Sequence, residues 1–244
     1  MKQKTDPSNL SEFIYSGEEL DHFAYASNWK GYWSSQIAPF IGTSVIEIGA
    51  GIGSTAKSLN TKHYEKWLAV EPDITMYQRI ENAKGTLDYP KNMDTLLGTS
   101  RNVPTNESYD SALYIDVLEH IEDDHEELSH IQKCLSKGGR VIILSPAHQW
   151  LFSEFDAKVG HYRRYDIASL TKTIPAGFTI LKIQYLDSVG MLASLVNKWF
   201  LKSESPTQAQ ILFWDRIIVK TSIFLDRMLG FRFGKTILCI LQKE

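Results

Sequence analysis

The sequence of 244 residues predicts one α/β domain, in which a mostly parallel β-sheet has helices on both faces and ends in an antiparallel strand. Two observations predict this fold class. From residue 45 onward, short apolar runs alternate with helical segments in a regular rhythm. A glycine-rich turn follows the first of these runs, at the position where open α/β sheets bind ligands.

An N-terminal helical segment over residues 1–40 is expected ahead of the sheet. Residues 1–10 are polar, and two short helices are expected over 11–24 and 27–40. Tyr25, Tyr32 and Trp33 lie in this aromatic-rich region, just before the first strand. They are candidates for a lid that contacts substrate and excludes water, and core packing is an equally good interpretation.

The first five strands follow from buried apolar runs separated by helices. They are expected at 45–48, 67–70, 93–97, 112–115 and 141–144. The intervening helices are expected at 54–59, 74–83 and 124–135. Gly138 and Gly139 are expected to end the last of these helices, because glycine is common just past a helix C-terminus.

Two further strands, at 178–186 and 236–241, are separated by a segment too long for a simple loop. This insertion, 187–233, is expected to hold a helix over 189–201, a linker over 202–207 and a helix over 208–229. The charged residues of the last helix fall within about 140° of arc and leave a wide apolar face. A lid, a homodimer interface or a membrane surface would each cover that face. The mixed charge signs argue against a purely anionic-lipid anchor and favour a lid or a dimer.

Composition restricts the functional class. The net charge is −3, which gives no reason to expect nucleic-acid binding. Cys134 and Cys239 stand far apart in unlike contexts, as expected for reduced thiols of a cytoplasmic protein. The polar start of the chain has no secretory signal, and no apolar run is long enough to cross a membrane.

The strongest motif joins the first strand to the first helix of the sheet, with Glu47 followed by Gly49, Gly51 and Gly53. Glycine there lets a ligand approach the backbone closely. Glu47 would repel a phosphate and attract an ammonium group. Glu71 ends the second strand, where a carboxylate can accept hydrogen bonds from two ribose hydroxyls. The third glycine arrives one residue too early for the dinucleotide fingerprint.

Four segments together carry a resemblance that spans roughly residues 30 to 186. They are Val45-Ile46-Glu47-Ile48-Gly49-Ala50-Gly51-Ile52-Gly53, Val70-Glu71-Pro72-Asp73, Tyr109 to Ile121, and Leu135-Ser136-Lys137-Gly138-Gly139-Arg140-Val141. In order and spacing they resemble the class I methyltransferases that use S-adenosylmethionine (SAM). The resemblance implies a Rossmann-like sheet and SAM as the cofactor.

The resemblance also implies roles for residues of the cofactor site. Gly49, Gly51 and Gly53 would line the methionine and ribose parts of SAM, and Glu47 would hold its amino group. Glu71 would bind the ribose hydroxyls, and Pro72 with Asp73 would border the adenine. Asp116 and Val117 would face the methionine end. Many relatives have an acidic residue after the third strand, where this chain has Gly98-Thr99-Ser100, so a hydroxyl such as that of Thr99 or the backbone is expected to bind adenine.

A second segment, Lys158 to Tyr165, resembles a subgroup of bacterial class I enzymes, some of them encoded beside or fused to glycosyltransferases. Tyr162, Arg163 and Arg164 are candidates to bind a carboxylate or phosphate of the substrate, or else lie on a solvated turn. His120 and His161 are the two candidates for a catalytic base.

No metal site is expected. The acidic run from Glu122 to Glu127 is interpreted as the favourable start of a helix. The predicted function is methyl transfer from SAM to the hydroxyl, amine or carboxylate of a small molecule, such as a natural product or a saccharide-type metabolite. The alternatives are a SAM-binding module without catalysis and an NAD-dependent oxidoreductase.

Overall fold

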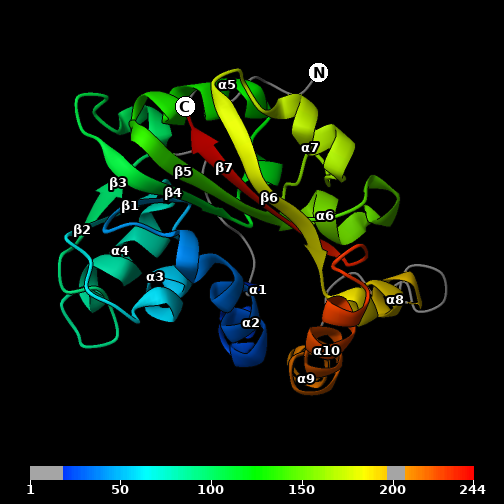
Figure 1. Ribbon diagram of the computed structural model, residues 1–244. Helices are drawn as coiled ribbons and strands as arrows, with labels where there is room; N and C mark the ends of the chain where they lie inside the picture. The colour runs from blue at the N-terminus through cyan, green and yellow to red at the C-terminus, as the bar shows by residue number, and fades with distance from the viewer. Residues whose placement is uncertain (1–18, 197–206) are drawn as a thin grey trace.

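A seven-stranded sheet with the order β3-β2-β1-β4-β5-β7-β6 forms the centre of the protein (Figure 1). The computed structural model describes residues 19–196 and 207–244. Strands β1 to β5 run parallel to one another, and β7 runs antiparallel to both β5 and β6. This topology confirms the predicted fold class. The strands are β1 (Ser44–Ile48), β2 (Lys66–Glu71), β3 (Met93–Leu97), β4 (Tyr109–Ile115), β5 (Leu135–Pro146), β6 (Phe178–Leu186) and β7 (Thr236–Lys243).

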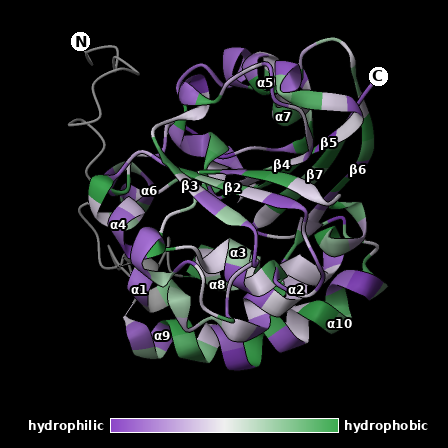
Figure 2. Ribbon diagram, turned by 90° about the vertical axis from the view of Figure 1, so that its left-hand side faces the viewer, coloured by the Kyte–Doolittle hydropathy of each residue, from purple (hydrophilic) through white to green (hydrophobic). Residues whose placement is uncertain are grey.

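Helices cover both faces of the sheet (Figure 2). Helices α5 and α7 lie on one side, and α2, α3, α9 and α10 lie on the other. The helices are α1 (Glu19–Ala24), α2 (Ser27–Ile37), α3 (Ser54–Leu59), α4 (Ile74–Ala83), α5 (Asp124–Lys133), α6 (Glu154–Lys158), α7 (Ile167–Thr173), α8 (Ser188–Val196), α9 (Gln208–Phe213) and α10 (Lys220–Met228).

Successive apolar side chains of the strands point to opposite faces of the sheet, so each face has its own hydrophobic core. In β1, Val45 joins the core beneath α2 and α3, whereas Ile46 joins the core beneath α5 and α7. In β4, Leu113 and Tyr114 divide in the same way. Successive side chains of a strand point to opposite faces, so a strand buried on both faces must be apolar throughout.

The boundary between α5 and β5 differs from the sequence prediction. Helix α5 ends at Lys133, and β5 already begins at Leu135, so Gly138 and Gly139 lie inside the strand. Gly138 has φ +75°, and the pairing of β5 with β4 shifts register between Tyr109 and Ser111. The glycines therefore accommodate an irregularity of the sheet instead of ending the helix.

The helical segments outside the sheet are described in part. Residues 11–18 of the first expected helix, 197–201 of the expected helix 189–201, and 202–206 of the linker lie outside the described residues. The expected helix 208–229 is present as α9, a π-helical segment over Trp214–Val219 (η7), and α10. Thr207 caps its start by accepting a hydrogen bond from the backbone of Gln210.

Two acidic residues attach the insertion to α2. Asp215 is 1% exposed and accepts hydrogen bonds from the backbone N–H groups of Asn28 and Trp29 at 3.2 and 2.8 Å. It thereby caps α2, which has no capping side chain of its own. Asp226, fully buried, accepts the Tyr32 hydroxyl at 2.8 Å. The charged residues of this helix therefore do not form one exposed face of mixed sign, because both acids point into the protein.

A third buried acid, Asp187, completes this attachment. Its carboxylate accepts hydrogen bonds from Ser222 Oγ at 2.6 Å and from Trp214 Nε1 at 2.7 Å. Asp226 in turn accepts the backbone N–H groups of Asp187 and Ser188 at the start of α8. The insertion is therefore a fixed part of the domain, held by hydrogen-bonded buried carboxylates.

Two further features concern the environment of the chain. Cys134 and Cys239 are buried free thiols, each in the core beneath α5 and α7. Among the helices of the described residues, none has the length and apolar character that crossing a membrane requires.

Candidate active site

A tight glycine turn follows β1 at the carboxyl edge of the parallel strands. Gly49, Gly51 and Gly53 have φ values of +66°, +58° and +79°, a region that favours glycine. A Cβ atom on Gly49 would lie 2.6 Å from Val117 Cγ2, so the turn also depends on close packing. The turn leads directly into α3, which leaves backbone N–H groups at the site.

Glu47 lies beneath this turn and is 1% exposed. Its Oε2 accepts a hydrogen bond from Trp67 Nε1 at 3.0 Å, whereas its Oε1 has no hydrogen-bond partner among the described residues. Burial raises the pKa of Glu47 to about 8, opposed by the hydrogen bond from Trp67. A cationic group arriving near this carboxyl would favour its ionised form.

Glu71 connects the end of β2 to the glycine turn. Its carboxylate accepts the backbone N–H groups of Gly51 at 2.7 Å and Asp73 at 2.9 Å. Burial raises the pKa of Glu71 to about 7, although these two hydrogen bonds oppose the shift. Asp73, which follows Pro72, caps α4 by accepting the backbone N–H groups of Thr75 and Met76.

The next two strands contribute Thr99 and Asp116 with Val117. Thr99 caps a short 3₁₀ turn, and its hydroxyl accepts the backbone N–H of Arg101 at 3.3 Å. Asp116 adopts φ +54°, which is uncommon for a residue other than glycine and frequent at functional sites. Desolvation by the surrounding protein raises the pKa of Asp116 to about 6, and the nearby His161, in its protonated form, and Lys235 oppose this.

Beside these residues, the two candidate histidines contact each other. The rings of His120 and His161 are edge to face, with centroids 4.5 Å apart. Burial lowers the pKa of His120 to about 4, and repulsion from the neighbouring His161 in its protonated form contributes to this effect. His120 therefore remains neutral at pH 7 and is a weak base.

His161 is held by Asp156, whose side chain is fully buried. Asp156 Oδ1 lies 2.8 Å from His161 Nδ1. Although burial opposes it, hydrogen bonds from His161 and Arg164 lower the pKa of Asp156 well below its usual range. An ionised carboxylate only accepts hydrogen bonds, so Nδ1 carries a proton, and in the neutral imidazole Nε2 is the nitrogen that holds the lone pair.

Glu119 faces the other nitrogen of this histidine. Its Oε1 lies 3.9 Å from His161 Nε2 and has no hydrogen-bond partner within the part of the chain that the structure describes, while Oε2 accepts a hydrogen bond from Ser145 Oγ at 2.8 Å. Burial, together with the nearby Asp116, raises the pKa of Glu119 well above its usual range. Glu119, His120 and His161 each place a potential ligand atom within 4.8 Å of the others, which is also the spacing of a metal-ligand set.

The two arginines that were expected to bind substrate instead pair with carboxylates of the protein. Arg163 contacts Asp124 at 2.6 Å, and Arg164 binds Asp156 through Nε at 2.7 Å and through NH2 at 2.9 Å. The Tyr162 ring lies against the Arg163 guanidinium, whose carbon is 5.8 Å from the ring centroid. Both guanidinium charges are therefore paired within the protein, and the substrate-binding role of the two arginines stays a prediction.

The aromatic lid candidates divide into two groups. Tyr25 is 60% exposed, but Tyr32 and Trp33 are buried in the core beneath α2 and α3. Burial and the hydrogen bond to Asp226 raise the pKa of Tyr32 well above its usual range. For Tyr32 and Trp33 the structure favours the packing role that the sequence left as an alternative.

Asp156 and Glu119 were not predicted as functional residues. Glu119 lies in the segment from Tyr109 to Ile121 that resembles the methyltransferases, but the resemblance assigns it no role. Asp156 precedes His161 by five residues, in a segment that contains no recognisable motif. The short α6, with its capping box at Ser153, turns the chain so that Asp156 and His161 meet. No spacing rule for loops would have identified this pair from the sequence.

Comparison with known proteins places this site in a family. A family model described as a methyltransferase domain matches residues 20–187. No curated protein sequence matches the chain. Among solved structures, a coclaurine N-methyltransferase bound to N-methylheliamine and SAH aligns with a TM-score of 0.59 at 15% identity, covering 88% of this chain and 72% of that one.

Two other structures show how widely this fold is used. The cyclopropane synthase MmaA2 from Mycobacterium tuberculosis aligns with a TM-score of 0.56 at 15% identity, covering 86% of this chain and 83% of that one. The [4+2]-cyclase SpnF aligns with a TM-score of 0.60 at 13% identity, covering 87% and 80%. At these identities the alignments show the fold, whereas the family model spans the glycine turn, both acids and the histidine pair. The chain therefore belongs to the methyltransferase-domain family and is a SAM-dependent methyltransferase of the class I fold.

Proposed function

We propose that this enzyme transfers the methyl group of SAM to a hydroxyl, amine or carboxylate of a small molecule, such as a natural product or a saccharide-type metabolite. The observation that carries the proposal is the Asp156–His161 pair, which lies at the same edge of the sheet as the glycine turn. The buried free thiols favour the cytoplasm as the compartment.

The residues of the turn fit the cofactor. Glu47 has a buried oxygen that finds no hydrogen-bond partner in residues 19–196 and 207–244, and Glu71 has a pKa of about 7 that an added pair of hydroxyl donors would lower. We assign Glu47 to the amino group of SAM, Glu71 to the ribose hydroxyls, and Pro72, Asp73 and Thr99 to the adenine side. When bound, SAM supplies an electrophilic methyl group on a sulfonium. Gly49, Gly51, Gly53, Asp116 and Val117 then line its methionine and ribose parts.

His161 is the base that we assign to the reaction. Asp156 fixes the proton on Nδ1, so Nε2 can accept the proton of an acceptor hydroxyl or ammonium. His120 is the weaker candidate because its lowered pKa reduces its basicity. A carboxylate acceptor would need no base. With Arg163 and Arg164 paired inside the protein, nothing in the site requires a negatively charged acceptor.

The test combines an open substrate search with matched variants. The protein is incubated with SAM carrying a labelled methyl group and with metabolite extracts, and labelled products are identified by mass spectrometry. His161→Ala should lower kcat about 10²- to 10⁴-fold, whereas the Kd for SAM should change less than about threefold. His120→Asn is the control from the same cluster and should have a much smaller effect.

Two outcomes would contradict this assignment. If SAM binds but no extract compound gains label, the chain is better described as a SAM-binding module without catalysis. If a chelator abolishes transfer and Zn²⁺ or Mn²⁺ restores it, then Glu119, His120 and His161 hold a metal, and His161 is not the base.

A further inference from the structure

The exposed face of the insertion is strongly apolar. Eight of the fourteen large apolar side chains that are exposed in the described residues lie between 192 and 233. They are Leu192, Val196, Phe213, Ile217, Phe224, Met228, Leu229 and Phe233. A concentration of exposed apolar side chains in one segment is typical of an interaction site. Figure 2 shows α9 and α10 along the edge of the molecule, with hydrophobic and hydrophilic bands alternating along them.

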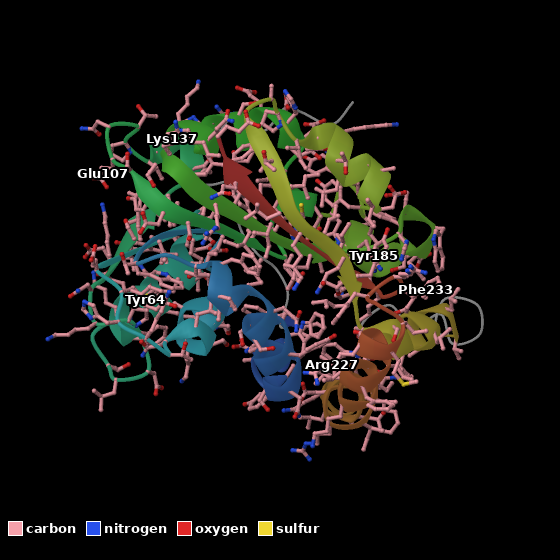
Figure 3. The ribbon with its side chains drawn as sticks, viewed as in Figure 1. Tyr64, Glu107, Lys137, Tyr185, Arg227 and Phe233 are labelled. Carbon is pink, nitrogen blue, oxygen red and sulfur yellow. The ribbon has the colours of Figure 1, made fainter. Side chains whose placement is uncertain are left out.

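Positive charges border this apolar face. Phe213, Ile217, Phe224 and Met228 recur at steps of four, seven and four residues, so they share one side of the helix. The exposed charged residues of the described insertion are all basic: Arg216, Lys220, Arg227 and Arg232. Arg216 directly precedes Ile217 in the sequence, and Arg227 directly precedes Met228. Figure 3 shows Arg227 and Phe233 on the insertion, well away from Tyr64 and Glu107.

This uniform charge arises because the acids are buried. Asp215 and Asp226 would alternate with the basic residues if the helix were isolated in water. Instead they cap α2 and bind Tyr32 in the interior. The surface left to solvent therefore combines aromatic and aliphatic side chains with positive charge, which is the composition of a helix that lies in a membrane interface.

We propose that the insertion docks this protein onto an anionic lipid bilayer, with α9, η7 and α10 lying in the plane of the interface. The phenylalanines and Met228 enter the acyl boundary, and the basic side chains contact acidic headgroups. A second copy of the chain fits this apolar face less well, because a two-fold interface would bring the basic residues of one copy against the same basic residues of the other. A lid over the site is excluded by the buried carboxylates that fix the inner face of the helix.

Docking would bring the active site close to the membrane. The insertion leaves the sheet after β6 and returns before β7, at the end where β5 finishes, and the Ala147 N–H donates to the Lys235 carbonyl at 2.7 Å. The glycine turn follows β1 at this same edge. An acceptor dissolved in the bilayer or attached to it would then reach the site from the docked face.

Vesicle flotation tests the proposal with the full chain. Wild-type protein should float with phosphatidylcholine vesicles that contain 30% phosphatidylglycerol, and should bind at least about tenfold less to pure phosphatidylcholine or in 0.5 M salt. Phe224→Glu combined with Met228→Glu should lower binding at least about tenfold. Leu87→Glu is the matched control, because Leu87 is 99% exposed in the loop between α4 and β3, and it should bind as wild type.

Three results would overturn the proposal. Wild-type protein that floats with neither vesicle has no lipid affinity. A Phe224→Glu, Met228→Glu variant that binds as wild type places the contact elsewhere. A dimer by light scattering that this variant converts to a monomer, with no vesicle binding by either form, shows that a second copy covers the face. Circular dichroism and thermal unfolding confirm that each variant is folded.

Discussion

Replacing Glu71 with glutamine is the sharpest test of the cofactor site. Both carboxylate oxygens accept backbone N–H groups in the free protein, those of Gly51 and Asp73. Glutamine keeps the size of the side chain but has one acceptor oxygen, so its amide NH₂ must face a backbone donor. The variant also loses the negative charge that would strengthen hydrogen bonds from the ribose hydroxyls.

The size of the effect follows from these contacts. A hydrogen bond to a charged group contributes about 1.5–3 kcal/mol, and two are expected between Glu71 and the ribose. Because the amide oxygen retains part of one of them, a net loss of about 2–4 kcal/mol is expected. At 1.4 kcal/mol per factor of ten, this corresponds to a Kd for SAM about 30- to 700-fold weaker than that of wild type.

Isothermal titration calorimetry with SAM, and separately with its demethylated product, measures this change. Glu65→Gln is the matched control, because Glu65 is exposed and immediately precedes β2, whereas Glu71 ends that strand. The control should bind as wild type. A folded Glu71→Gln protein that binds within about threefold of wild type would remove Glu71 from the site and refute the reasoning.

Three other variants or conditions test the structure. Gly49→Ala should destabilise the protein by about 1–3 kcal/mol more than Gly85→Ala in urea unfolding, since both glycines have positive φ but only Gly49 has a close neighbour. Equal losses would contradict the proposed packing of the turn. Asp215→Ala should cost about 2–4 kcal/mol because it leaves buried donors at the start of α2 unpaired, whereas Asp88→Ala should cost under about 1 kcal/mol, as that acid is in an exposed ion pair. Similar losses for the two would show that Asp215 is not needed as a cap. SAM affinity should fall up to about tenfold per pH unit below the Glu71 pKa of about 7, because the ionised carboxylate is the form that binds the ribose. The Kd for SAM, measured from pH 5.5 to 8.5, should not change with pH if Glu71 has no role. The unfolding free energy has the opposite dependence, because the folded pKa lies above the ordinary value of 4.5, so this contribution is lost as pH rises through 7.

The fold was largely predictable because its information is local. A strand buried on both faces must be a continuous apolar run, and Val45 to Ile48 or Val141 to Leu144 can be recognised without knowing their neighbours. The end of α5 was not predictable from the sequence. Gly138 accommodates a register shift between β4 and β5, and this shift depends on pairing across the sheet. Helix periodicity also failed to show that Asp215 points inward, since the reason lies in α2, almost 190 residues away.

That several candidate site residues lie close together was predictable for a similar reason. Glu47, the glycine turn and Glu71 lie at the ends of adjacent strands, so the order of elements brings them together. The ion pairs of Arg163 and Arg164 were not predictable, because a free guanidinium and a paired one look identical in sequence. The partners of these arginines, Asp124 and Asp156, come from α5 and α6 and are set by tertiary packing.

The position of β7 has a consequence for how the chain folds. Although β7 comes last along the chain, it lies in the interior of the sheet, with β5 on one side and β6 on the other. During synthesis β6 therefore has no strand to pair with until residues 236–243 have left the ribosome, and until then β5 keeps an open edge. Removing residues 236–243 would detach β6 from the sheet and leave the edge of β5 open to aggregation.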